Sequence, residues 1–115
     1  MRWSMRSLRQ IARKLGGKRT PDPEGAIAVL QIARRLVKDH GFKAIEALNE
    51  AAEKYASPID PAKAFWAAHY TLTTAGARKG YGYFEVCEAE IDVLLPIFDA
   101  AIQSQGATNL KAKKL

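Results

Sequence analysis

The 115-residue sequence contains a single cysteine, Cys87, and only two histidines, His40 and His69. One cysteine excludes an intramolecular disulfide, which agrees with a reducing, cytoplasmic compartment. A carboxylate-bridged di-iron bundle requires Glu-x-x-His pairs on its helices, and neither histidine lies at that offset from a glutamate. We therefore expect no metal ion and no cofactor.

Long apolar stretches are also missing. The longest run without a charged residue extends from Ala64 to Ala77, and it includes several polar positions. A membrane-spanning helix needs about 20 mostly apolar residues. We therefore expect no transmembrane segment.

Acidic residues are absent from the first twenty positions, where seven cations lie. The twelve acids all fall between residues 21 and 110, and this central part carries a net charge of −4. Three more lysines follow, and they restore the overall charge of +6. The positive charge is therefore concentrated at the two ends, a pattern typical of binding arms. The N-terminal cations are Arg2, Arg6, Arg9, Arg13, Lys14, Lys18 and Arg19, and the C-terminal ones are Lys111, Lys113 and Lys114.

This basic arm, residues 1–19, is the main functional candidate. Arginine presents a planar fork of donors that suits phosphate, so the arm predicts contact with nucleic acid or another polyanion. Two other interpretations stay open: an adaptor or accessory subunit whose arm wraps an acidic protein, and a membrane-surface protein with Trp3 and Leu8 in the interface. The arm also resembles a mitochondrial transit peptide, although we expect the segment that begins at Met1 to be retained and not cleaved off.

Helical periodicity dominates the sequence. Apolar residues recur at spacings of three and four in several segments, separated by glycine and proline. Short connections favour antiparallel neighbours, so the fold class predicted is all-α: a compact bundle of four core helices preceded by a basic amphipathic helix. The predicted parts are the arm and linker 1–20, the bundle 21–106 and the tail 107–115. The expected helices are 2–15, 24–40, 42–56, 61–75 and 83–105.

The expected helix ends follow from capping residues. Asp22-Pro23 and Asp60-Pro61 each combine an N-cap with proline at the first helical position. Gly41 is the expected left-handed residue after its helix. Gly76 and Gly106 should likewise end theirs, and His40 is placed to favour a helix C-terminus.

The predicted core joins the apolar faces of these helices. In the last helix the stripe continues from Phe84 and Cys87 onward, with a kink at Pro96. Aromatic residues such as Trp66 and Tyr70 are expected in or near the core, and His69 should be partly buried with a polar partner. The residues expected to be buried together are Leu30, Leu36, Ile45, Phe65, Leu72, Ile91, Leu94 and Phe98.

The segment 79–86 resembles the RNA-binding signature of the RRM fold, in which alternate aromatics stack on bases. Tyr81 and Tyr83 would take that role. The RRM fold needs four strands, whereas a helical stripe begins inside this segment, so a loop between helices is the better interpretation. Arg78 and Lys79, next to the glycines, remain a candidate secondary anion contact, with backbone N–H groups as additional donors.

Catalysis finds little support in the sequence. A nucleophile would need Cys87 or a serine beside a histidine. A pair of Cys87 with His69 lacks any evident third group or oxyanion hole. We therefore expect a binding protein rather than an enzyme, with nucleic acid, an acidic protein surface or a second copy of the chain as partner.

Overall fold

The computed structural model describes residues 23–54 and 60–114, and the side chains up to residue 105. The predicted helix 2–15 and the arm therefore lie outside the described residues. Within them the chain forms five α-helices and no strand, which confirms the all-α prediction. The helices are α2 (Pro23–His40), α3 (Ala44–Lys54), α4 (Pro61–Arg78), α5 (Tyr83–Glu88) and α6 (Ile91–Lys114).

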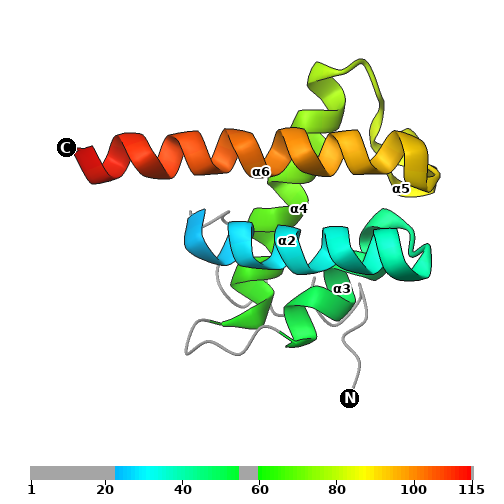
Figure 1. Cartoon of the computed structure of the whole chain (residues 1–115), viewed down its shortest axis with the longest axis horizontal. Coiled ribbons are helices and arrows are strands. Elements are labelled where there is room, and N and C mark those ends of the chain that lie inside the picture. Colours follow the sequence, from blue (N-terminus) through cyan, green and yellow to red (C-terminus); the bar gives the residue numbers. More distant parts are fainter. Residues whose placement is uncertain (1–22, 55–59, 115) are drawn as a thin grey trace.

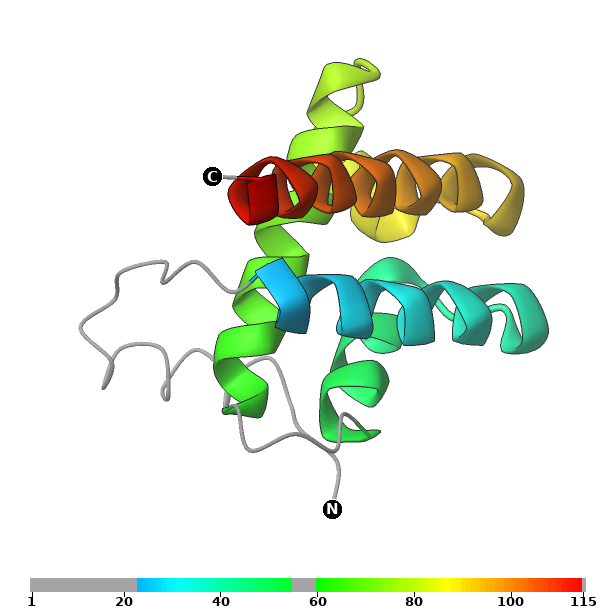
Figure 2. The ribbon, with the colours of Figure 1, turned by 60° about the vertical axis from the view of Figure 1, so that its left-hand side comes forward.

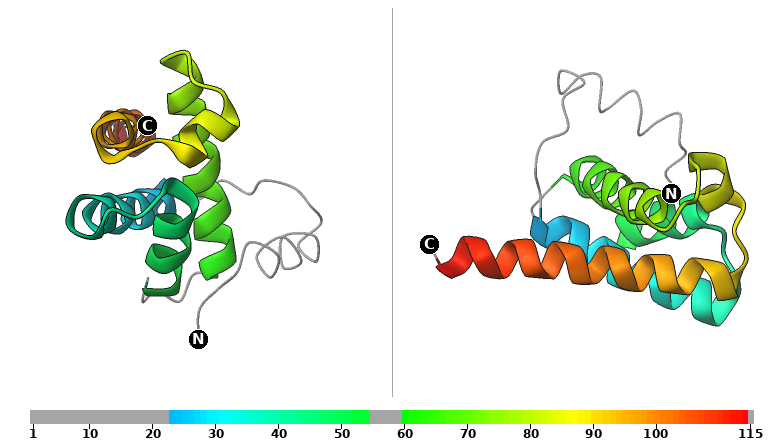
Figure 3. Two further views of the ribbon diagram at one scale, coloured as in Figure 1. Left: turned by 90° about the vertical axis from the view of Figure 1, so that its right-hand side faces the viewer. Right: turned by 90° about the horizontal axis from the view of Figure 1, so that it is seen from above.

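The arrangement is built on an antiparallel pair, α2 and α6, with α4 crossing both (Figure 1). Figure 2 shows the α2 and α6 axes running side by side, and the end-on view in Figure 3 shows α4 passing along one side of the pair. The short helices α3 and α5 pack against α4. Each helix thus finds a partner for its apolar face, as amphipathic helices of this length require.

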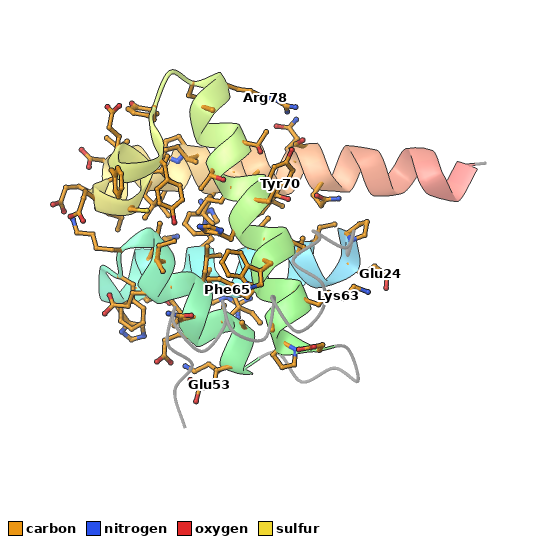
Figure 4. All side chains as sticks on the ribbon, turned by 180° about the vertical axis from the view of Figure 1, so that it is seen from behind. Glu24, Glu53, Lys63, Phe65, Tyr70 and Arg78 are labelled. Atoms are coloured by element: carbon orange, nitrogen blue, oxygen red, sulfur yellow. The ribbon has the colours of Figure 1, made fainter. Side chains whose placement is uncertain are left out.

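The core lies where α2, α3, α4 and α6 meet. Phe65 is completely buried and points from α4 into this interior (Figure 4). Many of the other buried positions are alanines, which let helix axes approach closely. Ile45 is only partly buried but packs against the core. Of the predicted core residues, Leu30, Leu36, Phe65, Leu72, Leu94 and Phe98 are buried.

Two predicted boundaries are confirmed in detail. The Asp60 side chain accepts a hydrogen bond of 2.9 Å from the backbone N–H of Ala62, which caps α4. Gly41 has a φ of 67°, the left-handed conformation expected after α2. Pro23 is the first described residue of α2, while its predicted cap, Asp22, lies outside the described residues.

Gly76 does not end α4, contrary to the prediction. The helix continues to Arg78, and Gly80, with a φ of 93°, takes the left-handed position. The N–H groups of Tyr81 and Gly80 donate to the carbonyls of Gly76 and Ala77, which is the Schellman pattern of helix termination. Gly76 serves packing instead: a Cβ added there would lie 2.4 Å from Cγ2 of Val86.

The single helix predicted for 83–105 is also wrong. The chain breaks at Ala89 and Glu90, so that α5 packs on α3 and α4 while α6 packs on α2 and α4. Gly106 does not end α6, which continues to Lys114. Figure 1 shows α6 passing Pro96 as one ribbon without the sharp bend that we expected.

Three aromatic or aliphatic residues expected in or near the core are exposed. Phe84 is 79% exposed, Tyr70 on α4 48% and Ile91 39%, and the break explains Phe84 and Ile91. A continuous helix from Phe84 to Ile102 would have kept one apolar face, but the break turns α5 and α6 toward different neighbours. Val86 alone of α5 then reaches the interior.

Candidate anion-binding surface

The principal predicted contact is the basic arm: Arg2, Arg6, Arg9, Arg13, Lys14, Lys18 and Arg19 all lie outside the described residues. What the structure does place is the point at which this segment joins the body, Pro23 at the start of α2. In Figure 1 this point and the last turns of α6 lie at the same end of the molecule.

Two ion pairs show that α2 and α6 run in opposite directions side by side. The Lys43 amine, just after α2, lies 2.9 Å from Oε1 of Glu90, just before α6. Midway along, Nε of Arg34 lies 2.6 Å from Oδ1 of Asp99. The start of α6 therefore lies beside the end of α2, and the last turns of α6, which include Lys111, Lys113 and Lys114, lie beyond the start of α2. We call this the basic end.

The secondary candidate, Arg78 and Lys79, lies at the C-terminal end of α4, where Figure 4 shows Arg78 far from the interior. Both side chains are exposed. The backbone around them is not available for an anion, since the N–H groups of Lys79, Gly80 and Tyr81 all donate to α4 carbonyls. A helix C-terminus is also the negative end of the macrodipole. Only the side chains of Arg78 and Lys79 remain as a candidate contact.

A second group of cations, on α2, was missed by the sequence reasoning. Arg34, Arg35 and Lys38 line an open hollow of about 480 Å³ between α2 and α6, together with Gln31, Asp39 and Ile102. The guanidinium of Arg34 is engaged by both carboxylate oxygens of Asp99, at 2.6 and 3.4 Å. Arg35 and Lys38 stay exposed. The spacing 34, 35 and 38 places all three on one helical face, and this was the available signal.

Most of the described acids lie in two groups away from the start of α2. The exceptions include Glu24, exposed in the first turn of α2, and Asp39 and Asp99, which lie beside the α2 cations. The first group, Glu46, Glu50 and Glu53, lies on α3, and the second lies at the opposite end of the α2–α6 pair: Glu85, Glu88, Glu90 and Asp92. All four of the latter are exposed. Phosphate groups would be repelled from that end and attracted to the other.

His69 has the partly buried, partnered environment that we predicted. Its Nε2 atom lies 3.0 Å from the Tyr83 hydroxyl, and its ring stacks on Phe65 with centroids 5.6 Å apart. Trp66 meets the same ring edge-on at 5.2 Å. Aromatic neighbours and a hydroxyl hold this histidine between α4 and α5.

Cys87 lies near the same group, where its surroundings disfavour the thiolate form. Burial raises the pKa of its thiol, an effect that a hydrogen bond from Tyr83 partly opposes and the nearby Glu88 carboxylate reinforces. A raised pKa keeps the thiol protonated, and only the thiolate attacks. Among the described residues no three His, Cys, Asp or Glu side chains are grouped to hold a metal ion. No described helix has both the length and the apolar character needed to cross a membrane.

Comparisons of the chain with protein-family models, with curated proteins and with solved structures gave no match. The functional argument therefore depends on the residues themselves, and above all on the contrast in charge between the acid-free arm and the acidic central part of the sequence.

Proposed function

We propose that this protein is a small non-enzymatic helical binding protein that contacts nucleic acid or another polyanion through its basic arm. The observation that carries the proposal is the acid-free run of seven cations in the first twenty residues, set against a central part with a net charge of −4. An acidic body weakens binding to phosphate, so affinity for a polyanion must come from the ends.

The described geometry supports this assignment of roles. The arm joins the body at Pro23, at the same end of the molecule as the last turns of α6, in whose sequence Lys111, Lys113 and Lys114 lie. We therefore expect the two basic ends of the chain to act on one polyanion. Contacts of this kind position a protein without reading bases, so we expect binding to be nearly independent of sequence.

The test is a salt titration of duplex DNA binding by the full chain. If about five arm cations meet phosphates, the logarithm of the binding constant should fall against the logarithm of salt concentration with a slope of about −4 to −5. Replacing Arg2, Arg6, Arg9, Arg13 and Lys14 by glutamine should remove most of that slope. Circular dichroism should show that the helices are retained.

The matched control is Arg78→Gln with Lys79→Gln. If these two side chains also contact phosphate, the slope should become less steep by about 2 units at most, and otherwise it should not change. Absence of binding at about 50 mM salt, or an unchanged slope in the arm variant, would contradict the proposal. Loss of a protein partner in the arm variant, without salt-sensitive DNA binding, would point to the adaptor function instead.

A further inference from the structure

The segment 83–92, which forms α5 and the start of α6, exposes apolar side chains that soluble helices usually bury. Phe84 is 79% exposed, Ile91 39% and Tyr83 40%, and the rings of Tyr83 and Phe84 meet edge to face with centroids 5.5 Å apart. In the whole segment only Val86 is buried. Exposed apolar side chains of this kind indicate a docking site when a partner with complementary side chains is available to bind them.

Acidic side chains accompany these apolar ones. Four of the ten residues are acids, none is a cation, and all four acids are exposed. Glu90 pairs with Lys43, whereas Glu88 and Asp92 form no ion pair with any described residue. The segment therefore exposes apolar and acidic side chains together, and it favours a partner that is apolar and basic.

The segment is held in place before any partner arrives. The amine of Lys43 donates to the Glu88 carbonyl at 3.0 Å and to Glu90 at 2.9 Å, which ties the α5–α6 junction to the start of α3. On its other side Val86 packs against Gly76 of α4. A fixed surface loses little conformational entropy on binding.

Charge excludes several occupants. Nucleic acid and anionic lipid would be repelled by the four carboxylates. The same segment of a second copy, related by a two-fold axis, would place like charges against one another, which costs affinity. The occupant must therefore present cations among apolar side chains.

Such a sequence lies at the other end of this same chain. Between positions 2 and 15 the arm carries five cations interleaved with Trp3, Leu8 and Ile11, and no acid. We propose that the 83–92 segment binds the basic arm of a second copy, so that copies associate head to tail. The arm joins the described body at Pro23, at the opposite end of the α2–α6 pair from the 83–92 segment. A heterologous contact between two different surfaces leaves one surface of each kind unoccupied in the assembly.

Geometry favours a second copy over the chain's own arm. The arm joins at Pro23, and the 83–92 segment lies beside the far end of α2, whose 18 residues extend about 27 Å. Residues 16–22, fully stretched, span at most about 25 Å. The chain's own arm could reach its own 83–92 segment only with this linker almost fully extended along the body, whereas the arm of a second copy has no such limit.

The first experiment is sedimentation equilibrium of the full chain without nucleic acid. At low salt the average mass should rise above the 12.7 kDa of one chain as concentration increases, and about 0.5 M salt should reverse the rise. Glu88→Lys with Asp92→Lys should weaken association at least about tenfold. The matched control, Glu24→Lys with Asp39→Lys, makes the same charge change at exposed sites outside the segment and should leave association much less affected.

The decisive experiment mixes two variants that are each defective. The E88K/D92K chain keeps its arm but loses the acidic surface, while an Arg6→Gln/Arg9→Gln chain keeps the acidic surface but weakens the arm without making it acidic. Each alone should be monomeric, and the equimolar mixture should form a 1:1 dimer that does not grow further. Circular dichroism of each variant checks that the helices are retained.

Three results would overturn the proposal: a wild-type chain that stays monomeric at low salt, a mixture that stays monomeric because arms dock on their own chain, or a symmetric dimer that E88K/D92K leaves intact. None of these measurements involves nucleic acid, so failure of head-to-tail association and failure of the polyanion function are distinguishable.

Discussion

Helix α4 and the 83–92 segment contain similar proportions of apolar residues but bury them very differently. In α4 seven of eighteen residues are buried, among them Phe65 and Leu72. In the 83–92 segment one of the ten residues is buried, and it is Val86. The difference teaches that an apolar pattern leads to burial only along the length over which a helix has neighbours. α4 contacts four other helices, whereas α5 is six residues long and contacts two.

The sharpest test of this comparison uses one residue type in both places. Phe65→Ala should lower the free energy of unfolding by about 3–5 kcal/mol, because it empties a completely buried site. Phe84→Ala should change it by no more than about 0.5 kcal/mol, because the side chain is largely in solvent already. Urea unfolding followed by circular dichroism measures both. Similar losses in the two variants would mean that Phe84 is covered, and that the contrast drawn above is wrong.

The two regions pack closely where Gly76 of α4 meets Val86 of α5. Gly76→Ala places a Cβ 2.4 Å from Cγ2 of Val86, a distance that forces one of the two helices to move. We expect a loss of about 1–3 kcal/mol, typical of overpacking.

Rescue distinguishes this clash from a simple change of helix propensity. Adding Val86→Ala should make Gly76→Ala much less costly, and a double-mutant cycle should show coupling of about 0.5–3 kcal/mol. Gly82→Ala serves as the control, because its Cβ would meet only the end of the flexible Glu85 side chain, at 3.3 Å. Strict additivity of the Gly76 and Val86 changes would argue against this close packing.

Gly76 and the break between α5 and α6 also show how much of the fold could be predicted from the sequence. The class, the start of α4 and the left-handed Gly41 followed from local signals, since a cap or a turn is decided by its own few residues. Gly76 was misassigned because its role depends on Val86, ten positions away and on another helix. The break at Ala89–Glu90 was missed for the same reason: the neighbours of α5 and α6 divide the stripe, and no glycine or proline marks the place.

The candidate site was predictable only in part. The basic arm and the charge contrast follow from composition alone. The hollow beside Arg35 and the position of the exposed acids of the 83–92 segment, at the opposite end of α2 from Pro23, require knowing that α2 and α6 are antiparallel. Such placement arises from tertiary packing, to which a periodicity argument has no access.

The Lys43 bridge gives a smaller effect. Lys43→Met should lower global stability by no more than about 1 kcal/mol, because both partners of the ion pair are well exposed. Its loss should instead loosen the 83–92 segment locally, since the amine also holds the Glu88 carbonyl. The Lys43→Met substitution should therefore increase the rate of amide hydrogen exchange more in residues 86–92 than in α4. Equal changes in both regions would show that the segment is not separately anchored.

The smallest expected effect concerns the thiol of Cys87, which reports how enclosed the inner side of α5 is. Burial raises its pKa, so the rate of alkylation by iodoacetamide should reach half-maximum at a higher pH than for a free cysteine. Tyr83→Phe removes the hydrogen bond that lowers the pKa and should move that midpoint higher still. As pH rises, the thiol ionises first in the unfolded chain, because its pKa is lower there. Any contribution of the thiol to folding stability is therefore complete below the ordinary pKa of cysteine, and it is lost as pH rises through the pKa in the folded state. A midpoint at or below that of free cysteine would mean that the inner side of α5 is as open to solvent as the side that carries Phe84.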